Sequence, residues 1–199
     1  LTNTTASNNT AVGYDSLKLN TTGTQNVAVG NDSLKANTTG AGNTASGYRA
    51  LQGNTTAANN TAFGADALYT NTTGASNTAV GKSSLGIGSY ALRLNTTGAN
   101  NTAVGYEALD KNTTGQYNTA MGYKALTSNT TANFTVAVGY EALKLTTTGV
   151  GNVGVGQSAL YSNTTGTDNT GVGYGVLDAS TTGARNAAIG SGAGGETTT

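Results

Sequence analysis

The stretch NTAVGYEAL at residues 101–109 recurs with small changes along the chain, and successive copies are seventeen residues apart. When its glycine, Gly105, is taken as position 0, most copies carry Ala-Val or a close variant just before the glycine and a leucine at position +4. A short fixed period is typical of a solenoid, in which each unit buries its apolar face only against its neighbours. We therefore predict a single repeat array of about twelve coils over residues 1–199.

The glycine at position 0 is the anchor of each copy, and we expect it to be structural. One interval is irregular, because only seven residues separate Gly81 from Gly88. Residues 82–88 are interpreted either as an inserted half-coil that keeps the later strands in register or as a surface loop. The anchors expected to be structural are Gly13, Gly30, Gly47, Gly64, Gly105, Gly122, Gly139, Gly156, Gly173 and Gly190.

Positions −3 to −1, which mostly read Thr-Ala-Val, predict a short β-strand in every coil. Side chains alternate across a strand, so the valine at −1 and the alanine at −2 lie on opposite faces. We expect the valine at −1 and the leucine at +4 to form a thin core. The alanine at −2 and the Ala or Ser at +3 are expected to form flat surfaces for close approach by another chain. Asparagine at −4 predicts a hydrogen-bonded ladder along the axis, and glycine at −7 predicts a turn.

The predicted fold class is all-β, a parallel β-solenoid with two short strands in each coil. Parallel strands about 4.8 Å apart give a rod about 55–60 Å long. A helical solenoid is disfavoured because each repeat contains two glycine sites, a Thr-Thr pair and several Asn, all poor helix formers. One Val and one Leu in each coil bury little apolar surface against the entropy of ordering the backbone, so we also predict an oligomer.

The composition excludes several kinds of catalytic and metal chemistry. The chain has no His, Cys, Trp or Pro. A Ser-His-Asp triad, a thiol nucleophile and a His or Cys metal site are therefore excluded, and we expect no cofactor and no metal. Asp110 and Glu107 are close in sequence, but a regular rod offers no cleft for a carboxylate pair. We predict that the protein is not an enzyme and has no catalytic residue.

Charge and hydropathy exclude further partners. Nine basic and nine acidic residues cancel, and Lys and Arg are nowhere dense enough to attract nucleic acid. No run of eighteen apolar residues is present, so we expect no membrane insertion. The sequence begins and stops inside a repeat and shows no atypical end repeat, so we expect a segment of a longer fibre.

The stretches NTAVGYEAL at 101–109 and NVAVG at 26–30 resemble the Ala-Ile-Gly-type repeats in the heads of trimeric autotransporter adhesins. A closer resemblance, over the whole chain, is to the shaft repeats of bacteriophage and algal-virus tail fibres. It implies a homotrimer in which each chain is a left-handed parallel β-roll, packed around a threefold axis and serving in attachment to a cell surface. The repeat is longer than the adhesin-head repeat by its Thr-Thr-Gly segment.

Variable charged residues at +2, +5 and +6 predict a solvated outer edge. Tyrosine recurs at +1 beside this edge. Two interpretations stay open, because a tyrosine at a strand end often covers the edge of the core, whereas a column of tyrosines can also stack against sugar rings. The candidate glycan contacts are Tyr14, Tyr48, Tyr106, Tyr123, Tyr140 and Tyr174.

We predict a structural shaft segment of a trimeric viral fibre, located in the virion, that takes part in attachment to a host cell-surface glycan or receptor. The alternative is an extracellular adhesin or filament of a bacterial or algal surface, with glycosylation suggested by fourteen Asn-x-Thr/Ser sites, which include Asn20, Asn37, Asn54, Asn71, Asn95, Asn112 and Asn163 in one column at −10. A minor alternative is ice binding by the Thr-Thr pair at −9 and −8, which is invariant in all twelve copies.

Overall fold

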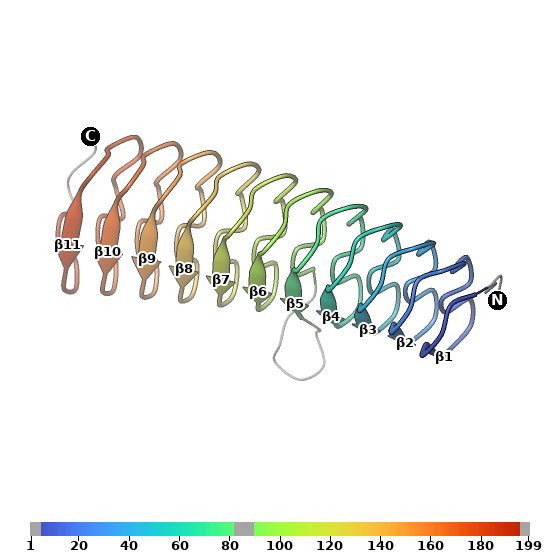
Figure 1. Cartoon of the computed structure of the whole chain (residues 1–199). Helices are drawn as coiled ribbons and strands as arrows, with labels where there is room; N and C mark the ends of the chain where they lie inside the picture. Colours follow the sequence, from blue (N-terminus) through green and yellow to red (C-terminus); the bar gives the residue numbers. More distant parts are fainter. Residues whose placement is uncertain (1–4, 82–89, 196–199) are drawn as a thin grey trace.

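The computed structural model describes residues 5–81 and 90–195. Eleven parallel strands of three residues form one sheet, and their order in the sheet is their order in the sequence (Figure 1). The predicted all-β parallel solenoid is confirmed. Within the described ranges, no helix is long and apolar enough to cross a membrane. The strands are β1 (Thr10–Val12), β2 (Val27–Val29), β3 (Thr44–Ser46), β4 (Thr61–Phe63), β5 (Thr78–Val80), β6 (Thr102–Val104), β7 (Thr119–Met121), β8 (Val136–Val138), β9 (Val153–Val155), β10 (Thr170–Val172) and β11 (Ala187–Ile189).

Neighbouring strands pair in strict register, so each repeat position forms a column along the rod. Ala103 of β6 pairs with Ala120 of β7, for example. The register also continues from β5 to β6, where Thr78 pairs with Thr102 although the interval is longer there. Both interpretations of residues 82–88 fall outside the described residues. The described strands on either side are nevertheless direct neighbours in the sheet.

The prediction of two strands in each coil is wrong for the described residues, since each coil contains one strand and otherwise bends and turns. The reason lies in the backbone at positions −5, +2 and +4. In the coil anchored by Gly122 these positions are Tyr117, Lys124 and Leu126, with φ angles of 58°, 53° and 54°. Left-handed residues interrupt an extended segment, so the chain turns three times instead of forming a second strand.

The predicted core is also wrong in one respect, because the strand faces the other way. The alanines at −2, such as Ala103 and Ala120, are fully buried, whereas Met121 at −1 is 44% exposed. The leucines at +4 are buried, as expected. Where Gly154 replaces the alanine at −2, an added Cβ would lie 3.0 Å from the Leu143 side chain. The space between the strand and the leucine therefore has room for a methyl group at −2 but not for a valine side chain.

The interior also contains two ladders of buried asparagines, of which the sequence predicted the one at −4. In that ladder the backbone N–H of Asn118 donates to Asn101 Oδ1 at 3.0 Å. In the second ladder, at −10, side chains bond directly from coil to coil: Asn112 Nδ2 donates to Asn95 Oδ1 at 2.8 Å. The same Nδ2 also donates to the Gly115 carbonyl of its own coil at 3.0 Å. The hydrogen-bonded asparagine side chains thus fill space that apolar side chains would otherwise occupy.

Two glycine columns allow the coils to stack closely. Gly122 at position 0 has φ of +136°, and an added Cβ would lie 2.3 Å from the carbonyl oxygen of Gly139 in the next coil. Gly115 at −7 was expected to supply an unusual backbone angle, but its φ is not in the left-handed region. The constraint there is space, since an added Cβ would lie 2.4 Å from the Ala132 carbonyl oxygen.

Candidate functional site

The charged edge, formed by positions +2, +5 and +6, lies beyond the anchor glycines, and its charges pair with one another. Lys144 Nζ lies 2.8 Å from Glu141 Oε1 within one coil, and Arg93 Nε lies 2.9 Å from Asp110 Oδ1 in the next coil. A hydrogen bond from Lys144 to Glu141 raises the pKa of Lys144, so the ammonium form is favoured. The charged edge is therefore a neutralised surface rather than a patch of one sign.

The two carboxylates that are close in sequence are held by different cations. Asp110 is buried and accepts two hydrogen bonds from Arg93, at 2.9 and 3.2 Å. Burial raises the pKa of Asp110, and the guanidinium opposes that shift. Glu107 lies 3.7 Å from Lys124 Nζ instead. Among the described residues, no group of three or more Asp or Glu side chains is arranged to hold a metal ion.

Three of the six predicted tyrosines form one stack, which we call the tyrosine column. The ring centroids of Tyr106 and Tyr123 are 5.3 Å apart with an interplanar angle of 11°, and those of Tyr123 and Tyr140 are 5.0 Å apart at 9°. Each ring therefore covers the face of the next. A sugar ring needs a free aromatic face for stacking. Tyr123, in the middle of the column, offers only its edge and hydroxyl.

The other three predicted tyrosines lie apart from the column. Tyr48 is half exposed, and the Arg49 guanidinium lies 4.6 Å from its ring centroid. Tyr14 and Tyr174 are 72% and 60% exposed, and in the described part of the chain no other ring stacks on them. The six tyrosines are thus one stack of three rings and three separate rings, of which Tyr14 and Tyr174 are the most exposed.

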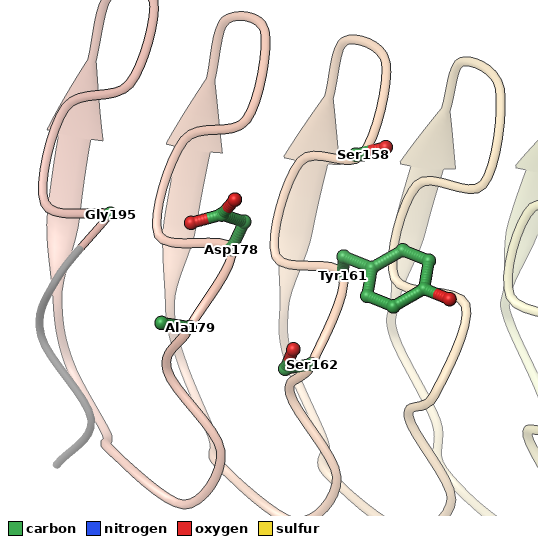
Figure 2. A pocket seen from close by; sticks show the side chains of 6 residues that line it. All are labelled: Ser158, Tyr161, Ser162, Asp178, Ala179 and Gly195. Atoms are coloured by element: carbon green, nitrogen blue, oxygen red, sulfur yellow. The ribbon is translucent and has the colours of Figure 1, made fainter.

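Two hollows lie along positions +5 and +6. The first, of about 440 Å³, contains Asp178 as its one carboxylate, and Figure 2 shows the Tyr161 ring pointing away from that carboxylate toward the preceding coil. Lys144 Nζ donates to the Tyr161 hydroxyl at 3.3 Å. The second hollow, of about 500 Å³, lies between Leu19 and Tyr69. Neither hollow is lined by the pair of carboxylates that glycoside hydrolysis requires.

The described sequons at −10 are inside the rod. Asn112 is fully buried, and its Nδ2, the atom that would carry a glycan, donates two internal hydrogen bonds. The same column contains Asn20, Asn37, Asn54, Asn71, Asn95, Asn129 and Asn163, all at most 1% exposed. A folded rod therefore has no room for glycans at these asparagines. Exposed sequon asparagines include Asn31, Asn59 and Asn100.

The comparisons with known proteins identify no relative. No family model, curated protein or solved structure matches the chain.

The surface that the sequence argument missed is the outer side of the sheet. The side chains at −3 and −1 of β1 to β11, here called the strand face, point outward: Val12 is 57% exposed, Phe63 45% and Ile189 80%. No charged residue occupies either position in these eleven strands. The invariably small residue at −2 was the signal that could have revealed this orientation, since only a methyl group or less fits inside.

Proposed function

We propose that the chain is a structural shaft segment of a trimeric viral fibre that takes part in attachment to a host cell surface. The observation that carries the proposal is the strand face, an uncharged outward surface along eleven strands, in which threonine predominates at −3 and the mostly apolar side chains at −1 are exposed in six strands and half-buried in five. The repeat sequence, which resembles fibre shafts, supplies the biological setting.

A rod with this surface is expected to associate with copies of itself. Eleven strands about 4.8 Å apart make a strip about 50 Å long. Soluble monomers rarely expose contiguous apolar patches larger than a few hundred Å². A cyclic trimer with its strand faces toward the axis buries this strip in each copy. It leaves the charged edge, with Tyr14 and Tyr174, on the outside, where contact with a cell-surface glycan or receptor takes place.

The second candidate is an extracellular adhesin or filament of a bacterial or algal surface. The same strand face supports this candidate, because any filament built from parallel copies needs a surface of that kind. Glycosylation, if it occurs on such a filament, is confined to exposed sequons such as Asn59 and Asn100. Binding of labelled rods to host cells, compared with binding of a Tyr14→Ala/Tyr174→Ala variant, tests the attachment role of either candidate.

The mass of the folded protein in solution tests the assembly. Light scattering on a size-exclusion column is expected to give three times the chain mass of 19.6 kDa. Met121→Lys and Val138→Lys place charges on the strand face, and their combination is expected to dissociate the trimer. Lys111→Glu on the exposed charged edge is the control and is expected to leave the trimer intact. A wild-type protein that is a folded monomer at micromolar concentration would refute the assembly.

A further inference from the structure

The threonine at −8 is exposed in every described coil, and no contact among the described residues explains why it never varies. Its neighbour at −9 has an internal role, since Thr113 Oγ1 donates to the Thr130 carbonyl of the next coil at 3.0 Å. The hydroxyl at −8 makes no hydrogen bond within the described residues. The exposed threonines are Thr5, Thr22, Thr39, Thr56, Thr73, Thr97, Thr114, Thr131, Thr148, Thr165 and Thr182.

Other exposed positions show that the copies have diverged wherever the fold permits. Position −5 is left-handed in every described coil, yet it holds residues as different as Asn100, Tyr117, Phe134, Asp168 and Arg185. Position +1 also varies, between tyrosine, asparagine, alanine, glutamine and serine. The constancy of the threonine at −8 is therefore a constraint on that position and not a remnant of recent duplication.

A constraint that is identical in every coil requires a partner that repeats at the spacing of the coils. A receptor domain or a short glycan contacts a few coils and leaves the others free to vary. A second copy of this chain, aligned in parallel, presents the same column at the same spacing along the whole rod. Residues at −6 lie outward beside the threonine and are also uncharged in every described coil, for instance Ala99, Gln116 and Val150. We call positions −8 and −6 the threonine flank.

The two surfaces on either side of the strand face, the threonine flank and the charged edge, differ in charge. The threonine flank precedes each strand in the sequence, and the charged edge follows it. In a cyclic assembly of identical chains, each interface joins one surface of a copy to a different surface of the next copy. Packing the apolar strand face on the charged edge would require desolvation of its ion pairs, which is costly. Positions −8 and −6 carry no charge in the described coils, so packing the strand face on them buries no ion pair of the flank; the nearest charges in sequence are Asp168 and Arg185 at −5.

We propose that the threonine flank of one copy packs against the strand face of the next copy, coil on coil, so that −8 threonines form part of every interface in the trimer. This inference rests on the proposed assembly and adds to it the second contact surface. The small side chains at −8 and −6 let the two sheets of coils approach closely, and the threonine hydroxyls find acceptors across the interface.

The test compares two sets of substitutions over the same three coils. Thr131→Glu, Thr148→Glu and Thr165→Glu place three charges on the threonine flank. Tyr140→Glu, Gln157→Glu and Tyr174→Glu place three charges at the equally exposed position +1. Both sets add three negative charges to the same three coils. The flank set is expected to raise the concentration of half-dissociation by about 100-fold or more, because charges buried at an interface lack partners. The control set is expected to change it by less than about threefold.

Disulfide cross-linking keeps the inference testable if the flank set fails to fold. The chain contains no cysteine, so single-cysteine variants have no background. Chains with Thr148→Cys are mixed with chains carrying one cysteine on the strand face, at Val138, Val155 or Val172. Oxidation is expected to give a dimer of the two different chains for at least one pair, since a disulfide needs Cα atoms within about 7 Å. Gln157→Cys replaces Thr148→Cys in the control and is expected to give none.

The outcomes separate this inference from the assembly on which it rests. A trimer that survives the flank charges, fails to cross-link through Thr148→Cys and still dissociates with Met121→Lys and Val138→Lys overturns the flank contact and leaves the assembly standing. A wild-type monomer overturns both. If that monomer also produces thermal hysteresis in ice growth, the periodic partner is an ice lattice instead of a second copy.

Discussion

Replacement of Asn112 by alanine tests whether buried amides hold the coils together. Asn112 Nδ2 donates to Asn95 Oδ1 at 2.8 Å and to the Gly115 carbonyl at 3.0 Å. Its Oδ1 accepts from Asn129 Nδ2 at 2.8 Å. Alanine removes all three hydrogen bonds from a site that is fully buried.

The size of the effect follows from what each former partner retains. The Gly115 carbonyl keeps a hydrogen bond from Asn101 Nδ2 at 2.8 Å, and Asn129 Nδ2 keeps one to a backbone carbonyl at 3.3 Å. Asn95 Oδ1 loses its donor, and a buried acceptor without a partner costs about 1–3 kcal/mol. The other two bonds add about 0.5–1.5 kcal/mol each. We expect the free energy of unfolding to fall by about 3 kcal/mol.

Denaturant unfolding followed by circular dichroism at one fixed protein concentration measures this change, because an oligomer's stability depends on concentration. Asn31→Ala, at an exposed position, is the surface control and is expected to change stability by less than about 0.5 kcal/mol. Asn112→Thr copies Thr146, which occupies the same column and donates to the Asn163 carbonyl at 3.0 Å. It is expected to recover part of the loss. A change below about 1 kcal/mol for Asn112→Ala would show that the ladder does not stabilise the rod.

Three further predictions concern backbone, core and charge. Gly122→Ala is expected to destabilise the rod by about 3 kcal/mol or more in denaturant unfolding, because a Cβ there meets a carbonyl oxygen at 2.3 Å and φ is +136°; an unchanged midpoint would contradict the close approach of the coils. Leu126→Ala removes a fully buried side chain and is expected to cost about 2–5 kcal/mol in the same assay, whereas a loss below 1 kcal/mol would contradict its burial. A hydrogen bond from Lys18, with a second from Lys35, lowers the pKa of Asp15, so its carboxylate stabilises the fold above the ordinary pKa of about 3.9 and the contribution is lost as pH falls below that value. The stability difference between wild type and Asp15→Asn is therefore expected to be present at pH 7 and absent near pH 2; an equal difference at both would refute the ion-pair interpretation.

The period of the repeat predicted much of the fold because it needs no knowledge of side-chain direction. The seventeen-residue spacing and the short Thr-Ala-Val segments predicted the parallel strands of a solenoid. The asparagine column at −4 predicted a ladder because identical amides in register can pair along an axis. The left-handed backbone at Leu126 and the other +4 leucines could not be read from residue type, since leucine rarely adopts that conformation.

Hydrophobicity could not predict which side chains of the strand face the interior of the rod. Val104 and Ala103 are both apolar, and transfer free energy favours burial of the larger side chain. The thickness of the coil reverses that preference, because the leucine at +4 and the amides of the two ladders already fill the interior. The tyrosine column is a similar case: the sequence placed Tyr106, Tyr123 and Tyr140 at the same position, but only the ring geometry shows that each covers its neighbour.

The constant and restricted repeat positions fall into two groups. Contacts within the chain explain the first group, and they do not explain the second. The position 0 glycine and the threonine at −9 are explained by contacts between successive coils of one chain, namely close approach to a carbonyl and a hydroxyl donated to another. The threonine at −8 has no comparable contact within the described residues, and the residue at −1, which varies but is never charged in the eleven strands, also points outward. A residue that is kept without an internal reason is kept for an external one. Because both columns run the length of the rod, the partner that we propose for them is a parallel copy of the chain, which is as long and as periodic as the rod itself.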